Sequence, residues 1–198
     1  MRKPTIASAL AKRIKLVGLD VDGVLTDGGL YIGMIDGRSV ELKRFHSQDG
    51  MGSVLLRAAG IAVALVSGRS AEATLIRARE LEVDAVMQDP DGQGRKLAPF
   101  EELLERRGLD WGDCAFVGDD VADLPLLRRV ALPIAVANAV PDVRAAARVV
   151  TKAPGGQGAV REVAELLLKA RGEWAGVLAQ YFEQREERDG ARRTRRTG

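Results

Sequence analysis

Short apolar runs alternate along the chain with longer segments of helical periodicity. Five runs are short, rich in β-prone residues and bounded by glycine or polar residues, which is typical of buried strands. They cover residues 14–20, 61–66, 84–87, 114–117 and 133–136. Segments with an apolar face at helical spacing follow them, at residues 48–59, 71–81, 96–108, 122–129, 139–147 and 159–170. The alternation predicts an α/β fold: a Rossmann-like, doubly wound parallel sheet covered by helices on both faces.

One segment departs from this alternation. Between the first predicted strand and the first predicted helix lie two short β-prone pieces, residues 30–32 and 40–43, and the stretch between them contains Asp36-Gly37. Aspartate followed by glycine between two such pieces is a hairpin signal. We therefore expect a β-hairpin inserted after the first strand.

The composition indicates one globular domain and limits its partners. The chain has 198 residues, of which 46% are hydrophobic, and a formal net charge of +2. This near balance of charges argues against a nucleic-acid-binding surface. We expect a lead-in at residues 1–13, a single domain at residues 14–182, and a disordered arginine-rich tail at residues 183–198, where apolar residues are few.

Neither a membrane segment nor a disulfide is predicted. No apolar run approaches the ~20 residues that a membrane-spanning helix needs, and the N-terminal residues lack an apolar stretch of signal-peptide length. The single cysteine, Cys114, has no second cysteine to pair with. We therefore expect a soluble protein of the cytoplasm.

Polar side chains gather at the carboxyl ends of the predicted strands. Because these ends meet at one edge of a parallel sheet, where such folds bind their ligands, we expect the side chains to converge. They are Asp20 and Asp22 after the first strand, Ser67 after the second, Lys96 at the start of the helix that follows the third, Asp119 and Asp120 after the fourth, and Asp123 one helical turn later.

Several carboxylates in one small cleft repel each other unless a cation binds among them. Mg²⁺ fits, because it takes oxygen ligands and keeps water molecules for a substrate phosphate. The backbone turns at Gly23, so that one of Asp20 and Asp22 can face the metal while the other serves as an acid or base. Asp20 could then attack phosphorus as a nucleophile. Lys96 and Ser67 would supply a cation and a donor for the oxygens of the transferred group.

The order and spacing of these residues resemble the four motifs of the haloacid dehalogenase superfamily of phosphatases. The matching pieces are Asp20-x-Asp22-Gly-Val-Leu-Thr, Ser67-Gly-Arg, Lys96 and Gly-Asp119-Asp120-x-x-Asp123. Further pieces are similar to those of its capless subfamily that acts on 3-deoxy-D-manno-octulosonate 8-phosphate, a precursor in lipopolysaccharide synthesis. They are Thr26-Asp27-Gly28, Phe45-His46-x-x-Asp49-Gly50 and Gly155-Gly156-x-Gly158-Ala159-Val160-Arg161-Glu162.

The resemblance implies a Mg²⁺-dependent phosphatase that works through a phospho-aspartate. By it, Asp20 is the nucleophile, and Asp22 protonates the leaving sugar oxygen and then activates water. Asp20, Asp119 and the backbone carbonyl of Asp22 would bind Mg²⁺. Lys96 would bridge the nucleophile and the phosphate, and Ser67 and the Gly68 amide would bind the phosphate. Asp120 and Asp123 would support the metal and Lys96.

The resemblance also implies that a cap domain is absent and that four copies assemble, so that a neighbour closes each site. The short distance from Asp22 to the first predicted helix agrees, since it holds a hairpin but no lid. We expect a homotetramer with the hairpin at its interface. Candidate substrate-binding residues are Arg69, Asp27, Gly28, His46 and Arg161, together with Lys43 and Arg44.

Two other functions remain open. Gln48 stands where the octulosonate enzymes commonly carry arginine, and the segment 88–95 is long and acidic. Both leave open a nine-carbon substrate, a keto-deoxy-nonulosonate or sialic acid 9-phosphate. The alternative of another class is a phospho-accepting signalling domain, although such domains carry the acid pair on the first strand and the phosphorylated aspartate on a later one. Structural interpretations also stay open for two pieces: an ion pair with Glu165 for Arg161, and a flexible loop for residues 155–158.

Overall fold

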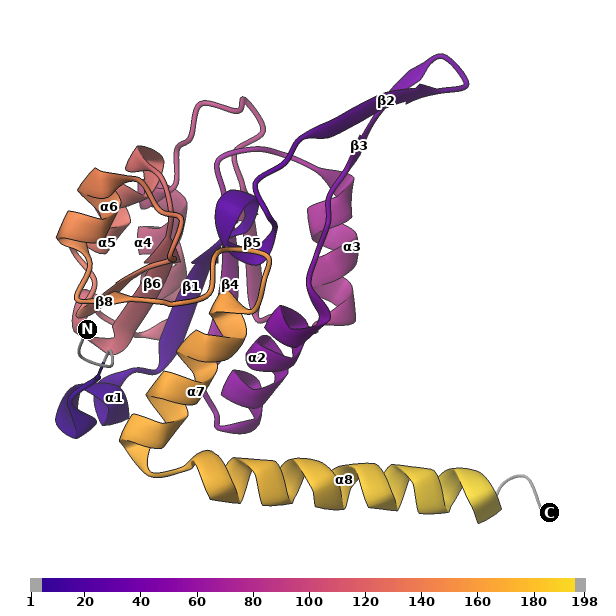
Figure 1. Cartoon of the computed structure of the whole chain (residues 1–198), viewed down its shortest axis with the longest axis vertical. Coiled ribbons are helices and arrows are strands. Elements are labelled where there is room, and N and C mark those ends of the chain that lie inside the picture. Colours follow the sequence, from indigo (N-terminus) through magenta and orange to yellow (C-terminus); the bar gives the residue numbers. More distant parts are fainter. Residues whose placement is uncertain (1–4, 195–198) are drawn as a thin grey trace.

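A parallel sheet forms the centre of the molecule (Figure 1). The computed structural model describes residues 5–194, and their side chains up to residue 186. Six strands are hydrogen-bonded in the order β5-β4-β1-β6-β7-β8, and every pair is parallel. Their bounds are β1 Leu16–Asp20, β4 Ala62–Ser67, β5 Ala85–Gln88, β6 Cys114–Gly118, β7 Leu132–Ala135 and β8 Val149–Val150. From β1 the chain builds the sheet first toward β5 and later toward β8, so a topological switch point lies beside β1, where α/β folds bind ligands.

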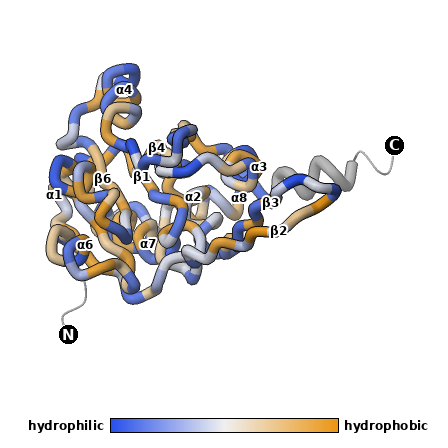
Figure 2. Tube along the Cα trace, turned by 90° about the horizontal axis from the view of Figure 1, so that it is seen from above, coloured by the Kyte–Doolittle hydropathy of each residue, from blue (hydrophilic) through white to orange (hydrophobic). Residues whose placement is uncertain are grey.

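Helices cover the sheet on both faces. α4 lies on one face, and α2 and α7 pack side by side on the other (Figure 2). The helices are α1 Ser8–Arg13, α2 Ser47–Ala58, α3 Glu72–Glu80, α4 Leu97–Arg107, α5 Leu124–Leu127, α6 Pro141–Ala146, α7 Ala159–Arg171 and α8 Trp174–Thr194. The predicted α/β fold is therefore confirmed, and the element boundaries agree to within a few residues.

The centre of the sheet packs tightly against α4 because β1 contains a glycine. A Cβ on Gly18 would lie 2.6 Å from the Phe116 ring and 2.9 Å from the Phe100 ring, closer than side chains pack. The two phenylalanine rings meet edge to face at a centroid distance of 5.9 Å, a favourable arrangement. Gly18 thus lets a large aromatic pair sit directly on the strand that ends in Asp20.

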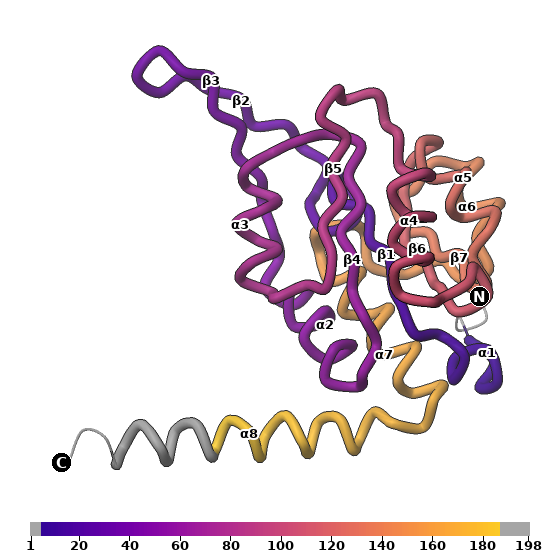
Figure 3. The backbone as a smooth tube through the Cα atoms, turned by 180° about the vertical axis from the view of Figure 1, so that it is seen from behind, coloured from indigo at the N-terminus to yellow at the C-terminus, as the bar shows by residue number. Residues whose placement is uncertain are grey.

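The predicted hairpin is confirmed and projects away from the body (Figures 1 and 3). β2 Tyr31–Ile35 and β3 Arg38–Leu42 are antiparallel. Asp36 and Gly37 join them with φ values of 49° and 74°, the left-handed conformation that a tight hairpin turn requires. The hairpin carries most of the large apolar side chains that are exposed among the described residues, namely Leu30, Tyr31, Ile32, Met34, Ile35 and Leu42.

Both ends of the described chain contain a helix. Part of the expected lead-in is the helix α1, and Arg171 donates to the carbonyls of Ala11 and Ile14 at 3.3 and 3.0 Å, which ties this segment to α7. At the other end, α8 continues through the expected tail as far as Thr194. Glutamate, glutamine and arginine are good helix formers, so a lack of apolar residues does not prevent a helix here. Residues 195–198 lie outside the described part of the chain.

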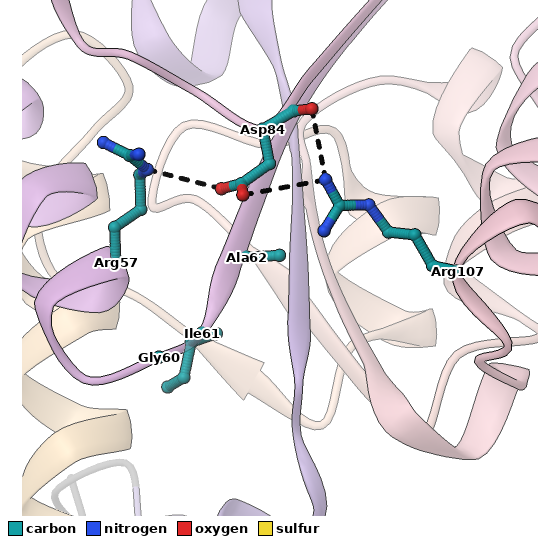
Figure 4. A pocket seen from close by; sticks show the side chains of 6 residues that line it. All are labelled: Arg57, Gly60, Ile61, Ala62, Asp84 and Arg107. Atoms are coloured by element: carbon teal, nitrogen blue, oxygen red, sulfur yellow. Dashed lines mark hydrogen bonds and ion pairs between the residues drawn. The ribbon is translucent and has the colours of Figure 1, made fainter.

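An aspartate organises the amino edge of the sheet, opposite the carboxyl ends of the strands. Asp84 accepts a hydrogen bond from the Val63 amide at 2.9 Å. Arg57 and Arg107 reach its carboxylate from opposite sides at 3.4 and 3.6 Å, and Arg107 also donates to its backbone carbonyl (Figure 4). Asp84 and the two arginines line a small pocket of about 210 Å³. None of the described helices has the length and apolar character needed to cross a bilayer.

Candidate active site

The turn after β1 brings Asp20 and Asp119 together. Asp20 is the last residue of β1, and the chain then winds tightly through Val21–Leu25, with Gly23 at a φ of 93°. The Thr26 hydroxyl accepts hydrogen bonds from the amides of Gly23 and Gly28 at 3.3 and 3.2 Å, which fixes the turn. A Cβ on Gly23 would lie only 2.0 Å from an oxygen of Asp119. Glycine is therefore required for the close approach of this turn to β6.

Lys96 lies between two buried carboxylates. Its Nζ donates to Oδ1 of Asp20 and to Oδ1 of Asp123, both at 2.7 Å. Burial alone would lower the pKa of Lys96, but the two carboxylates outweigh it and raise the pKa above its ordinary value. Lys96 is therefore a fixed cation at the predicted place, immediately before α4.

The acids outnumber this cation. Carboxylate oxygens of Asp20, Asp119 and Asp123 lie within 4.8 Å of one another. Burial, with Asp123 as the next cause, raises the pKa of Asp20 well above its ordinary value and that of Asp119 to about 6. Three carboxylates around one ammonium group leave excess negative charge in a buried cleft, which a bound cation relieves.

The three acids do not have equal freedom to bind a metal. Both oxygens of Asp123 accept hydrogen bonds, one from Lys96 and one from the Asp119 amide at 2.9 Å. Oδ1 of Asp119, in contrast, is buried and has no hydrogen-bond partner among the described residues. Asp20 and Asp119 therefore fit a metal-binding role and Asp123 a supporting one. Asp120 lies outside the cluster, and its side chain accepts from the Val121 amide at 2.7 Å to cap the next turn.

Asp22 lies in a separate charged network at the base of the hairpin. Its carboxylate forms an ion pair with Lys43, whose side chain is only 1% exposed. Lys43 also lies 3.2 Å from Glu41, and the other Glu41 oxygen accepts from Arg69 at 2.7 Å. This network joins the turn after β1, the hairpin and the turn after β4. The sequence reasoning missed Glu41, and the only signal for it was its place two residues before Lys43.

The predicted phosphate-binding turn follows β4. The Ser67 hydroxyl accepts from the Arg69 amide at 3.1 Å, which holds the turn in shape. A Cβ on Gly68 would lie 2.8 Å from the Gly94 backbone and 3.5 Å from the Lys96 side chain. The structure thus brings Ser67 and Gly68 to the same edge as Lys96, as the sequence predicts.

The glycine-rich segment before α7 supports the turn after β1. A Cβ on Gly155 would lie 1.7 Å from the Gly23 carbonyl, and one on Gly156 would lie 2.4 Å from the backbone of Thr26 and Asp27. The Gly156 amide donates to the Val24 carbonyl at 3.0 Å. The two loops therefore pack backbone to backbone, and the flexible-loop interpretation of residues 155–158 does not hold.

A buried carboxylate on α2 holds this segment in place. Asp49 accepts from the amides of Gly158, Val160 and Arg161 at 3.0, 2.8 and 3.2 Å, at the start of α7. Its burial raises its pKa in spite of these three donors. Sequence reasoning missed this role, although Asp49 belongs to the quoted Phe-His-x-x-Asp-Gly piece and lies near the start of the predicted helix at residues 48–59.

The predicted substrate-binding residues differ in their partners and in their distance from the site. Asp27 accepts from the Gly29 amide, the Tyr31 hydroxyl and Arg44 at 3.0, 3.1 and 3.3 Å, and chiefly the Gly29 amide lowers its pKa. Asp27, like Gly28, therefore shapes the base of the hairpin.

His46 immediately precedes α2, and its buried Nδ1 has no partner among the described residues. Arg161 is not brought to the site. It pairs with Glu165 at 2.9 Å and stacks over Trp174 at 5.3 Å, so the structural interpretation holds for it in this chain.

Comparisons with known proteins extend over most of the chain. A family model described as a haloacid dehalogenase-like hydrolase matches residues 91–162. The chain is 42% identical over 171 residues to the 3-deoxy-D-manno-octulosonate 8-phosphate phosphatase KdsC of Escherichia coli (strain K12), which covers 85% of this chain and 88% of that protein.

Solved structures agree. The chain is similar to 3-deoxy-D-manno-octulosonate 8-phosphate phosphatase from Moraxella catarrhalis, solved in complex with a magnesium ion, a phosphate ion and a KDO molecule. The TM-score is 0.80 at 37% identity, over 88% of this chain and 97% of that one. It is also similar to the phosphatase from Yersinia pestis that carries the same description, with a TM-score of 0.79 at 38% identity over 86% and 89% of the two chains.

Proposed function

The chain belongs to the family of 3-deoxy-D-manno-octulosonate 8-phosphate phosphatases, within the haloacid dehalogenase-like hydrolases, and we propose that it hydrolyses this sugar acid phosphate. The products are the free eight-carbon sugar acid, a precursor for lipopolysaccharide, and inorganic phosphate. The observation that carries the proposal is the buried cluster of Asp20, Asp119, Asp123 and Lys96 at the sheet's switch point. It supplies a nucleophile, a metal site and a fixed cation in one place.

The acidic cluster fits Mg²⁺. The excess negative charge, the unpartnered buried oxygen of Asp119 and the all-oxygen donor set match the preferences of this ion. We assign Asp20, Asp119 and the backbone carbonyl of Asp22 as its ligands, with Asp123 and Asp120 supporting them. When bound, the ion supplies positive charge that screens the carboxylates and stabilises the negative oxygens of the phosphoryl group.

Asp20 performs the displacement. Lys96 holds its Oδ1 at 2.7 Å, which fixes the carboxylate and offsets its charge. The carboxylate attacks phosphorus, the bond from phosphorus to the sugar oxygen breaks, and a phospho-aspartate forms. Lys96, Ser67 and the Gly68 amide supply positive charge and donors for the phosphoryl oxygens as their charge develops.

Asp22 moves the protons. An alkoxide is a poor leaving group, so the sugar oxygen takes a proton from Asp22 as its bond to phosphorus breaks. Asp22 then accepts a proton from the water that attacks the phospho-aspartate, and Asp20 is restored as phosphate leaves. Asp22 is separate from the Asp20 cluster and pairs with Lys43, which leaves Asp20 as the carboxylate that faces the metal and phosphorus.

The substrate's own carboxylate would be recognised at the base of the hairpin. Lys43 supplies a cation beside Asp22 and Glu41, and Arg69 supplies a second one on the other oxygen of Glu41. The buried Nδ1 of His46, which has no partner among the described residues, can bind a further polar group. Arg44 is the more exposed candidate and is engaged by Asp27. Arg161 would have to leave Glu165 and Trp174 to take part, so it contributes least to the proposal.

We extend the proposal to a homotetramer in the cytoplasm. The exposed apolar side chains of the hairpin favour burial against other copies, because so many large apolar side chains exposed on one element are unusual on a monomer. A hairpin held in an interface would also be fixed over Asp22 and Lys43. Light scattering coupled to size-exclusion chromatography measures the assembly, and a monomer at working concentration contradicts it.

A substrate panel tests the proposed function. Purified protein with Mg²⁺ is given 3-deoxy-D-manno-octulosonate 8-phosphate, a keto-deoxy-nonulosonate 9-phosphate, a sialic acid 9-phosphate and glucose 6-phosphate, and phosphate release is measured. We expect the highest kcat/KM with the eight-carbon acid. A preference for a nine-carbon acid would favour the alternative that Gln48 leaves open. No turnover together with a long-lived phosphoprotein would instead indicate a signalling domain.

A further inference from the structure

The loop between β5 and α4 is built around one aspartate. Asp89 follows β5 directly, and its side chain is only 2% exposed. It accepts from the backbone amides of Asp91, Gln93 and Arg95 at 3.2, 3.0 and 3.0 Å, and from the Arg95 guanidinium at 3.1 Å. One carboxylate thus holds residues 89–95 in a single shape, although the loop contains Gly92 and Gly94 in left-handed conformations.

The charge of Asp89 is strongly stabilised in this position. The Arg95 guanidinium is the main cause, and the backbone donors add to it, so that the pKa of Asp89 falls to about 2. The carboxylate is therefore ionised at any working pH and keeps its full capacity to accept hydrogen bonds.

The loop contacts both parts of the predicted phosphate-binding site, which are the turn after β4 and Lys96. At its start, the Asp89 amide donates to the Ser67 carbonyl at 3.1 Å. Near its end, the Gly94 backbone lies so close to Gly68 that a Cβ there would be 2.8 Å away. The residue after Arg95 is Lys96, whose Nζ contacts Asp20 and Asp123. By fixing this loop, Asp89 therefore also helps to fix the positions of Ser67, Gly68 and Lys96.

We propose that Asp89 is a positioning residue of the phosphate-binding site, which sets Gly68 and Lys96 in register with each other by fixing the loop that lies between them. Two loops at the ends of adjacent strands β4 and β5 have to meet the same phosphoryl group. Misplacement by about 1 Å can cost about 100-fold in rate, and three backbone hydrogen bonds to one buried carboxylate prevent it. This inference rests on the proposed function and deepens it.

The loop provides its own matched control. Asp91 lies in the same loop, carries the same charge and also pairs with Arg95, but its side chain is 57% exposed. No hydrogen bond from a backbone amide to the Asp91 carboxylate is found among the described residues. Asp91→Asn therefore removes a negative charge without releasing the backbone of the loop.

The experiment compares Asp89→Asn, Asp89→Ala and Asp91→Asn in the full chain with Mg²⁺. Steady-state kinetics give kcat and KM for the best substrate of the panel, and titration calorimetry gives the Kd for inorganic phosphate. We expect kcat to fall about 10- to 100-fold in Asp89→Ala, with a smaller loss in Asp89→Asn, which keeps one accepting oxygen. The Kd for phosphate should rise at least about fivefold in Asp89→Ala, and Asp91→Asn should stay within about twofold of the wild type in both quantities.

Thermal unfolding separates positioning from a merely structural role. A structural residue lowers Tm but leaves kcat and phosphate affinity of the folded protein unchanged, which would overturn the inference. Equal losses in Asp89→Asn and Asp91→Asn would also overturn it, since they would point to charge rather than loop shape. If Asp89→Ala does not fold, the isosteric Asp89→Asn carries the test alone. A wild type that releases no phosphate from any substrate defeats the proposed function, whereas an active wild type with unaffected Asp89 variants defeats only this inference.

Discussion

Two clusters of acids and bases lie at opposite edges of the same sheet, and they are built on opposite plans. At the amino edge, one carboxylate, Asp84, meets two guanidinium groups and a backbone amide (Figure 4). At the carboxyl edge, the carboxylates of Asp20, Asp119 and Asp123 share the single ammonium group of Lys96. The first cluster has a surplus of donors, and the second has a surplus of buried negative charge.

This difference separates a structural ion cluster from a functional one. The Asp84 cluster is partly exposed and complete within the chain, so it holds β4, β5, α2 and α4 together without a ligand. The Asp20 cluster keeps an unpartnered buried oxygen on Asp119, and burial raises the pKa values of Asp20 and Asp119. Buried carboxylates with raised pKa values are typical of functional sites, where a bound cation offsets their charge.

Replacement of one aspartate in each cluster should give the largest difference in activity between the two edges. We expect Asp20→Asn to lower kcat by more than about 10³-fold, because an amide cannot form the phospho-enzyme. Asp84→Asn, the same chemical change at the other edge, should leave kcat within about twofold. Phosphate release from the best substrate measures both. Comparable losses in the two variants would show that the edges do not differ in function.

Removal of the metal should act on one cluster only. We expect a chelator to abolish turnover and Mg²⁺ to restore it. In the absence of substrate, Mg²⁺ should raise Tm of the wild type by several degrees, since it binds the folded state alone. Asp119→Asn should lose most of this rise, whereas Asp84→Asn should keep it. Differential scanning calorimetry with and without Mg²⁺ gives the shifts, and a full rise in Asp119→Asn would contradict the ligand assignment.

Loss of the Asp84 side chain should affect stability rather than activity. Asp84→Ala leaves the Val63 amide without its acceptor and removes the carboxylate that Arg57 and Arg107 share. We expect the free energy of unfolding to fall by about 1–3 kcal/mol. Urea unfolding followed by circular dichroism measures it, with an unchanged KM as the control. An unchanged midpoint would mean that the amino-edge cluster contributes nothing to the fold.

The pH dependence gives the smallest and most specific effect. The pKa of Asp119 is raised to about 6 in the folded, metal-free protein. A carboxyl group with a raised folded pKa favours folding while it is protonated, fully below its unfolded pKa of about 4, and this contribution is lost as the pH rises through about 6. In the presence of a chelator, a rise from about pH 5 to about pH 7 should therefore lower Tm of the wild type by a few degrees more than Tm of Asp119→Asn. Parallel curves for the two proteins would refute this.

Much of the site follows from the sequence because it depends on the repeating pattern of strands and helices. Asp20, Ser67 and Asp119 each end a short apolar run, and parallel strands bring such ends to one edge whatever the loops do. The hairpin follows from Asp36-Gly37, whose backbone preference is local. The predicted helix starting at Lys96 needed only the apolar periodicity of residues 97–104.

What the sequence left open concerns contacts between distant loops. Asp49 and the start of α7 are separated by more than a hundred residues, and no local pattern joins them. Arg161 has the residue type of a substrate ligand, but its direction on α7 leads it to Glu165 and Trp174. The glycines at residues 155 and 156 indicate flexibility in the sequence, and only the packing against Gly23 shows that they allow close contact.

By itself, the sequence determined the class of fold and the edge at which the acids meet, because strand period and strand ends are local properties. The assignment of Asp20 as the nucleophile comes from the resemblance of the motifs and is part of the proposal. The tertiary structure alone decided which carboxylate lacks a partner, which lysine pairs with Asp22 and which loops hold Lys96 in place. Those outcomes depend on distances of a few ångströms between segments that only the folded core brings together. The chemistry of the site was thus predictable, whereas its supporting contacts were not.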